Sequence, residues 1–292
     1  MEENKEQVSN GQDEKNKNEN IDLQAKIREF ELAGRFDEDL LENPPTKILM
    51  PEDVDYLRKK ISSKIKRNFY YFLARKFLNK LLKTQTLIIK EIKGLENYTK
   101  LDSGAILTCN HFSALDTFAN EYLYDMSKHK KRKLFRVIRE GNYTNFPGLF
   151  GKIMRHCNTL PLSSNKDTMK NFVRSLNHVL QKGNFVLVYA EQGMWPNYKK
   201  PRPLKKSAFK MAVTNNVPVL PIFITMEDTD IVGMDGQKSQ AFTIHVGKPI
   251  YADSNLSLQE NIENMKNENF TVWKNIYEET YKIPLTYLCD KK

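Results

Sequence analysis

The stretch AILTCNHFSALD, residues 105–116, contains a predicted strand, a turn and the start of a predicted helix. The apolar run Ala105–Thr108 predicts a buried strand, and Ser113 is a typical N-cap for a helix that begins at Ala114. His111 therefore falls at the carboxyl end of a strand, just before a helix. In open α/β sheets ligands usually bind at this edge. The stretch predicts an α/β fold with a candidate site at His111.

Short β-type runs alternate with helical patterns on both sides of this stretch. The strands are predicted at residues 86–91, 105–108, 133–138, 159–162, 185–189, 219–224 and 241–246. The helices are predicted at residues 113–126, 166–182, 205–215 and 257–282. Strands that alternate with helices form a largely parallel sheet covered by helices. We therefore expect an α/β fold over residues 85–292, a mostly parallel twisted sheet flanked by helices.

The residues before this domain divide into two regions. Residues 1–20 are polar and mixed in charge, which predicts a disordered tail. Residues 21–84 are expected to be helical, with one helix within 21–43 and a longer helical segment within 51–83. In that longer segment an apolar side chain recurs every fourth position, at Leu57, Ile61, Ile65, Phe69, Leu73 and Phe77.

The charge of the chain is concentrated on this longer segment. The net charge is +10, and eleven Lys and Arg but no Asp or Glu lie between Tyr56 and Lys90. An apolar stripe opposite a basic face is typical of an amphipathic helix that docks on an anionic membrane. The alternatives are packing of the stripe on the α/β domain and binding of nucleic acid, for which no module is recognisable. We expect a peripheral protein, because no run approaches about 18 apolar residues.

The three cysteines, Cys109, Cys157 and Cys289, are widely spaced and form no CxxC pair. This pattern argues against a disulfide framework and against a structural zinc site. Residues 1–20 also lack the apolar segment of a secretory signal. These features favour a reducing, cytoplasmic setting, and no metal site is expected.

His111 and Asp116 are the candidate catalytic pair. On one continuous helix, residues five apart would point about 140° away from each other, but a turn before the helix lets them meet. A carboxylate bound to one ring nitrogen fixes the tautomer, and the other nitrogen then suits removal of a proton from an alcohol. Ser113 and Asp116 also match a capping box, in which Asp116 would be structural. The pair alone leaves both interpretations open.

The chain resembles the glycerolipid acyltransferase family, which includes the 1-acyl-glycerol-3-phosphate acyltransferases. The family's first block is Asn-His-x4-Asp, and residues Asn110 through Asp116 match it. Its third block, Phe/Tyr-Pro-Glu-Gly-Thr-Arg, is similar to residues 189–194, where Glu191 is retained and Met194 replaces the Arg. Its fourth block is similar to residues 217–222, VPVLPI. The resemblance covers about residues 85–250.

The second block departs from the family pattern, which places a phosphate-binding Arg after a strand. If Leu160–Leu162 is that strand, Ser163 stands in place of the Arg, with Arg155 before it and Lys166 after it. A basic segment follows Glu191, and its Lys199, Lys200 or Arg202 is a candidate to bind the headgroup instead. A solvated basic loop, or one that touches anionic lipid, is the alternative.

The resemblance implies transfer of a fatty acyl group from acyl-CoA or acyl carrier protein (acyl-ACP) to a lysophospholipid hydroxyl in phospholipid biosynthesis. The implied acceptor is 1-acyl-glycerol-3-phosphate, the implied product phosphatidic acid and the implied place the cytoplasmic face of a membrane. His111 would act as general base oriented by Asp116, with no cofactor. The implied substrate-binding residues are Asn110, Glu191, Gln192, Gly193, Arg155, Lys199 and Arg202. Another lysophospholipid or a glycolipid as acceptor, and a non-enzymatic binder of anionic membranes, are the alternatives.

Overall fold

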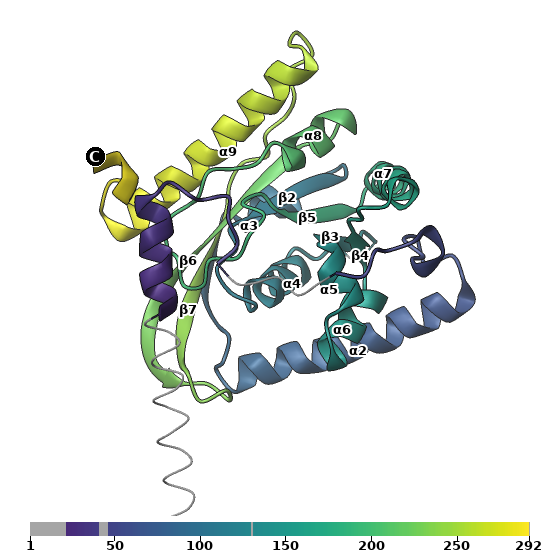
Figure 1. Cartoon of the computed structure of the whole chain (residues 1–292), viewed down its shortest axis with the longest axis horizontal. Helices are drawn as coiled ribbons and strands as arrows, with labels where there is room; N and C mark the ends of the chain where they lie inside the picture. The colour runs from purple at the N-terminus through teal and green to yellow at the C-terminus, as the bar shows by residue number, and fades with distance from the viewer. Residues whose placement is uncertain (1–21, 41–45, 130, 292) are drawn as a thin grey trace, which may run out of the picture.

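The computed structural model of the chain describes residues 22–40, 46–129 and 131–291, so the tail predicted over residues 1–20 lies outside it. Within the described residues, seven strands form one sheet in the order β1-β7-β6-β2-β5-β3-β4 (Figure 1). Every neighbouring pair is parallel except β6 and β7, which are antiparallel. The predicted α/β fold with a mostly parallel sheet is confirmed.

The elements lie close to their predicted positions. The strands are β1 (Ile88–Lys93), β2 (Ala105–Cys109), β3 (Leu134–Ile138), β4 (Thr159–Pro161), β5 (Phe185–Tyr189), β6 (Val219–Val232) and β7 (Lys238–Val246). The helices are α2 (Ile61–Lys83), α3 (Leu95–Thr99), α4 (Asp116–Met126), α5 (Glu140–Thr144), α6 (Gly148–His156), α7 (Lys166–Gln181), α8 (Ser207–Thr214) and α9 (Leu258–Tyr281). Residues 22–32 are also helical.

Strand β2 lies between β5 and β6, and all five of its residues are buried. Ile106 packs in one apolar core with residues of α7, α8 and α9. Ala105, Leu107 and Cys109 face a second core, which includes residues of α2 and α4. Burial of such side chains stabilises the fold by about 1.5–3 kcal/mol each. Helices therefore cover both faces of the sheet, and the carboxyl end of β2 is held in place from both sides (Figure 1).

Strand β6 and the short helices α3, α5 and α6 differ from the prediction. Strand β6 is predicted to end at residue 224 but continues to Val232, because its pairing with β7 extends beyond the core and its side chains from Glu227 onward are mostly exposed. The short helices α5 and α6 are not predicted, because glycines and Pro147 break the helical pattern of residues 140–156. Pro147 is in fact the N-cap of α6.

The region predicted as helical over residues 21–84 has two structural roles. Residues 22–40 and 46–60 lie against the α/β domain: Leu40, Leu49 and Tyr56 are all buried, and the Tyr56 hydroxyl donates to Pro161 O at 2.8 Å. Helix α2 begins at Ile61, about ten positions after the predicted start, because residues 54–60 are not helical. No helix in the described part of the chain is long and apolar enough to cross a bilayer.

The apolar stripe of α2 changes its surroundings along the helix. Leu78 and Leu81 are buried at its C-terminal end, where the helix packs on the sheet. The N-terminal half is different: Ile61, Ile65, Phe69 and Phe72 are 54–75% exposed. Packing of the whole stripe on the domain, one of the alternatives raised by the sequence, is therefore wrong for residues 61–72.

Candidate active site

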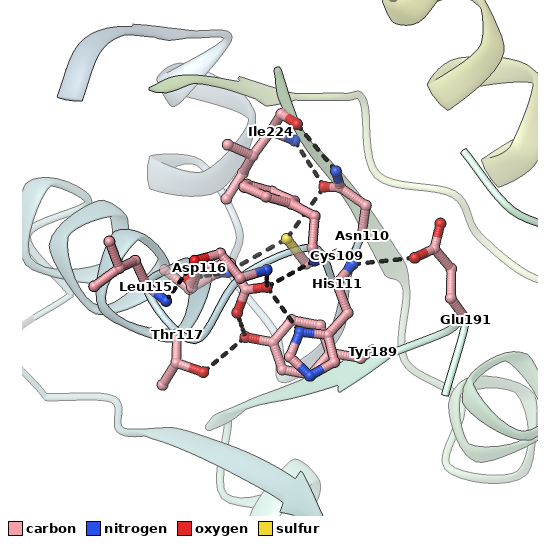
Figure 2. A network of polar contacts seen from close by, with 12 residues as sticks. Cys109, Asn110, His111, Leu115, Asp116, Thr117, Tyr189, Glu191 and Ile224 are labelled. Carbon is pink, nitrogen blue, oxygen red and sulfur yellow. Dashed lines mark hydrogen bonds and ion pairs between the residues drawn. The ribbon is translucent and has the colours of Figure 1, made fainter. Parts of the chain in front are cut away.

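The His-Asp pair forms at the junction between β2 and α4. Strand β2 ends at Cys109 and α4 begins at Asp116, so His111 lies in the turn between them. Phe112 is buried and holds this turn in the core, with its ring 5.2 Å from that of Phe242. His111 Nδ1 lies 2.7 Å from Asp116 Oδ2 (Figure 2). The turn brings the two side chains together, as the sequence predicts.

The Asp116 carboxylate is fully buried and is held by four donors. Oδ2 is bound by His111 Nδ1 and accepts from the backbone amides of Phe112 and Ser113, both at 3.2 Å. Oδ1 accepts from the Tyr189 hydroxyl at 2.6 Å. A buried carboxylate is costly unless its oxygens are bonded in this way. Asp116 therefore orders the turn and the imidazole together, so the catalytic and structural interpretations are compatible.

Ser113 does not cap the helix as predicted. The N-cap position belongs to Leu115, and the Ser113 hydroxyl accepts instead from the Leu115 amide at 3.1 Å. The full capping box suggested by Ser113 and Asp116 is thus absent, although the Ser113 amide does bond to Asp116. The helix therefore begins two residues later than the sequence pattern indicates.

The bond to Asp116 determines the tautomer of His111. A carboxylate only accepts, so Nδ1 carries the proton and the Nε2 lone pair is available. Nε2 has no hydrogen-bond partner within the described ranges, and the His111 side chain is 22% exposed. This is the arrangement that a general base requires before a substrate arrives.

Asn110 is predicted to bind substrate, but the structure gives it a different role. Its side chain is 2% exposed, its amide nitrogen donates to Ile224 O at 3.0 Å and its oxygen accepts from Ile224 N at 2.8 Å (Figure 2). Both polar ends of the amide are used by the backbone of β6. The prediction of a substrate contact is therefore corrected: Asn110 joins the end of β2 to β6 beside His111.

We expect Asn110→Ala to lower the free energy of unfolding by about 1–3 kcal/mol, because it leaves two backbone groups of Ile224 unpaired in the core. Urea unfolding would measure the change. Asn97→Ala is the matched control, since Asn97 makes one partly buried bond of this kind, to Val246 O at 2.9 Å. An equal or smaller loss at Asn110 would contradict the two-bond arrangement.

Glu191 binds the turn and the following loop together. Its side chain is 3% exposed and accepts from the His111 amide at 3.1 Å, from the Arg202 amide at 2.8 Å and from the Arg202 guanidinium at 3.1 Å. Trp195 N also donates to His111 O at 3.1 Å. These contacts make Glu191 a residue that orders the loop beside the site, and its predicted contact with substrate stays a prediction.

Gln192 and Gly193 follow Glu191 at the carboxyl end of β5. Gln192 is exposed and has a left-handed backbone with φ of 67°. Gly193 is enclosed, and a Cβ there would lie 3.1 Å from Asp39 Oδ1, so a side chain would press on residues 22–40. Both lie next to the His111 turn, and their predicted contact with substrate stays a prediction.

The cations of the basic segment after Glu191 are all engaged in ion pairs. Lys199 pairs with Asp228 at 3.2 Å and Lys200 with Glu31 at 2.5 Å. The remaining pairs are Arg202 with Glu191, Lys205 with Asp37 and Lys206 with Glu263. Arg202 is buried in its pair, whereas Lys199 and Lys206 stay 38% and 58% exposed in theirs. Of the three candidate headgroup ligands, Lys199 is 38% and Lys200 24% exposed, whereas Arg202 is 1% exposed.

The position of the family's second-block Arg is occupied by Ser163, which lies against Glu140. The Ser163 hydroxyl lies 2.8 Å from both Leu49 O and Glu140 Oε1, and Ser164 also bonds to Glu140. Burial raises the pKa of Glu140, but hydrogen bonds with the Leu49 amide, Ser163 and Ser164 outweigh it, so the pKa is lowered. Arg155 donates to Tyr143 O at 3.1 Å and Phe146 O at 3.2 Å within its own helical region. A headgroup role for Arg155 stays a prediction.

Sequence reasoning missed Tyr189, which completes the site. Its ring stacks on His111, with centroids 4.0 Å apart and planes at 16°, and its hydroxyl binds Asp116. Tyr189 lies directly opposite Cys109 in the register of β2 and β5. Alignment of the carboxyl ends of the two strands would have placed it beside His111.

Catalysis by a cysteine nucleophile or by a metal ion finds no support among the residues that the structure describes. Cys109 is buried, and burial followed by the charge of Asp116 raises the pKa of its thiol well above the usual value. It therefore stays a thiol and is a poor nucleophile. Among the described residues, no group of three or more His, Cys, Asp or Glu is arranged to hold a metal ion.

Comparison with known proteins indicates the class. Residues 90–225 match the family model described as Acyltransferase. The matched range includes both His111 and Glu191. This part of the chain is therefore similar to the acyltransferase domains of that family. A search of curated proteins found no match.

A search of solved structures matches the 1-acyl-sn-glycerophosphate (LPA) acyltransferase PlsC from Thermotoga maritima. It has 19% sequence identity and a TM-score of 0.47, and the match covers 79% of this chain and 100% of that chain.

Proposed function

We propose that the protein transfers a fatty acyl group from a thioester, acyl-CoA or acyl-ACP, to the hydroxyl of a lysophospholipid. The similarity to acyltransferase domains supports the reaction class. The observation that carries the proposal is the His111-Asp116 pair, with Nδ1 held at 2.7 Å by a buried carboxylate and Nε2 left available. No nucleophilic side chain is needed, because the lipid hydroxyl itself attacks.

In the proposed reaction, His111 Nε2 removes the proton of the acceptor hydroxyl. The oxygen forms a bond to the thioester carbonyl carbon, and the carbon–sulfur bond then breaks. The thiolate leaves with the proton from His111 Nε2, which restores the neutral imidazole. Asp116 stabilises the imidazolium formed between the two steps, since its carboxylate lies against Nδ1.

The first acceptor to test is 1-acyl-glycerol-3-phosphate, which the family resemblance implies and which would give phosphatidic acid. A second candidate is a lysophospholipid or glycolipid without a terminal phosphate. It is favoured by Glu140, which bonds to Ser163 at the second-block position, and by the ion pairs of Lys199 and Arg202. A carboxylate in that position repels a phosphate dianion, so the two candidates predict different acceptor preferences.

Acyl transfer from radiolabelled oleoyl-CoA and from oleoyl-ACP should be measured with a panel of 1-acyl acceptors that bear different headgroups. The proposal expects acylation at a free glycerol hydroxyl for at least one lysophospholipid. Preference for a neutral glycolipid would move the function to the second candidate. The absence of transfer to every lipid acceptor, at any donor, would contradict the proposal.

We also propose that the exposed half of α2 docks on an anionic membrane. Helix α2 packs on α6, where the ring of Phe150 lies 5.2 Å from that of Phe77, and Leu149 and Phe150 are 42% and 39% exposed. Figure 1 shows α2 and α6 side by side at one edge of the molecule. The lysines and arginines of α2 would interact with the lipid headgroups, at about 1 kcal/mol each.

The triple substitution of Ile65, Phe69 and Phe72 by serine is expected to lower binding to vesicles by about 100-fold or more, because each side chain contributes roughly 1.5–3 kcal/mol when buried. Co-sedimentation with phosphatidylcholine–phosphatidylserine vesicles would measure it. The control replaces Val173, Tyr251 and Leu258, which are 53%, 63% and 51% exposed elsewhere. Equal loss in both variants would contradict docking through α2.

A further inference from the structure

We propose that Tyr189 is a positioning residue for the His111-Asp116 pair: it fixes the imidazole by stacking and limits the negative charge that Asp116 presents to it. This inference rests on the proposed function of His111 as general base. Tyr189 comes from β5 and His111 from the end of β2, so two neighbouring strands build the catalytic group together (Figure 2).

The contacts of Tyr189 occupy both its ring and its hydroxyl. The ring lies parallel to the imidazole at a centroid distance of 4.0 Å, which prevents the imidazole from tilting toward β5. The hydroxyl lies 2.6 Å from Asp116 Oδ1 and 2.9 Å from Thr117 Oγ1. The tyrosine therefore contacts both members of the pair at once.

The direction of each proton follows from the chemistry of the groups. The Asp116 carboxylate only accepts, so the single Tyr189 proton points to Oδ1, and the Thr117 hydroxyl must donate to the Tyr189 oxygen. Burial, and then the charge of Asp116, raises the pKa of the Tyr189 phenol well above its usual value, so the phenol stays a donor. The result is a chain of donors that runs from Thr117 through Tyr189 to Asp116.

These hydrogen bonds affect how strongly Asp116 stabilises the protonated form of His111. A donor on Oδ1 draws negative charge away from Oδ2, the oxygen that faces His111 Nδ1. The imidazolium is then stabilised less than it would be beside an unshared carboxylate. The other titratable groups close to His111 are Glu191, which bonds to its amide and is paired with Arg202, and Cys109.

The test is Tyr189→Phe, which keeps the stacked ring and removes only the hydroxyl. On the acidic limb we expect kcat/KM at a given pH to fall by about 3–10-fold, with KM for the acceptor little changed. The acidic limb of the kcat/KM profile should move to higher pH by about 0.5–1 unit, because Asp116 then holds the imidazolium more strongly. A residue that served only as packing would lower stability without moving the profile.

Two variants and one spectroscopic measurement complete the test. Thr117→Val should move the limb in the same direction but by less, and Tyr251→Phe, at an exposed position, should leave it in place. Titration of His111 by ¹H–¹⁵N NMR should show the same upward movement in Tyr189→Phe without any turnover. An unmoved titration and profile in Tyr189→Phe would overturn the inference while the function stands. Full activity of His111→Ala would instead overturn the proposed function.

Discussion

Replacing Asp116 with alanine is expected to lower kcat by roughly 1,000–10,000-fold, the loss seen when a catalytic histidine loses its carboxylate partner. The substitution leaves His111 Nδ1, two backbone amides and the Tyr189 hydroxyl without their acceptor. The free energy of unfolding should also fall, by about 1–3 kcal/mol or more for the unpaired groups. Single-turnover acyl transfer and urea unfolding would measure the two effects.

Asp116→Asn separates the charge of Asp116 from its shape. The asparagine oxygen can accept at the Oδ2 position, while its NH₂ group faces Tyr189, whose hydroxyl can rotate to accept and then donate to Thr117. The tautomer of His111 is kept, so we expect a smaller loss of kcat, of roughly 100-fold, from the missing charge alone. If asparagine were as damaging as alanine, the expected rotation of the Tyr189 hydroxyl would be wrong. If alanine retained activity, Asp116 would have no catalytic role.

Arg202→Ala is expected to destabilise the fold by about 3–5 kcal/mol, because it leaves the Glu191 carboxylate buried without its cation. Both side chains are almost fully enclosed, at 1% and 3% exposure, and Arg202 also lies over the Trp195 ring at 4.9 Å. The His111 amide shares the same carboxylate, so the turn should loosen and kcat should fall with stability. Thermal and urea unfolding would measure the change.

Lys199→Ala is the matched control from the same basic segment. Its ion pair with Asp228 is exposed, at 38% and 75%, and such pairs contribute about 0–1 kcal/mol. The two variants also test the predicted headgroup ligands. Loss of acceptor affinity in Lys199→Ala at unchanged stability would support Lys199 as a ligand. A loss of stability at Arg202 no larger than that at Lys199 would contradict the buried pair.

The centre of the fold was predictable because its sequence signals are local. Five adjoining residues from Ala105 form a buried strand between two apolar layers, and the predicted strand at 185–189 has the bounds of β5. His111 and Asp116 lie close along the chain, so the turn that joins them is enough to bring them together. The family blocks at residues 189–194 and 217–222 fall on the two strands that flank β2.

The partners of the site were harder to predict, because they depend on pairing across the sheet. Asn110 binds β6 more than 100 positions later, and Tyr189 reaches Asp116 from β5. The helical pattern of residues 22–32 also gives no sign that Phe30 and Phe36 pack around Trp195 in the loop after Glu191. Lys199 and Arg202 were predicted to bind the headgroup because of their charge. Their acidic partners could not be foreseen, because Asp228 lies on another strand and Glu191 was itself predicted to bind substrate.

The most direct test of the central claim is a comparison of wild type and His111→Ala in the acyl-transfer assay with the lysophospholipid panel. We predict that wild type acylates at least one acceptor and that His111→Ala lowers kcat by roughly 1,000-fold or more while the protein stays folded, because the proposed general base is removed. Equal activity of the two proteins would contradict the assignment of His111 as general base.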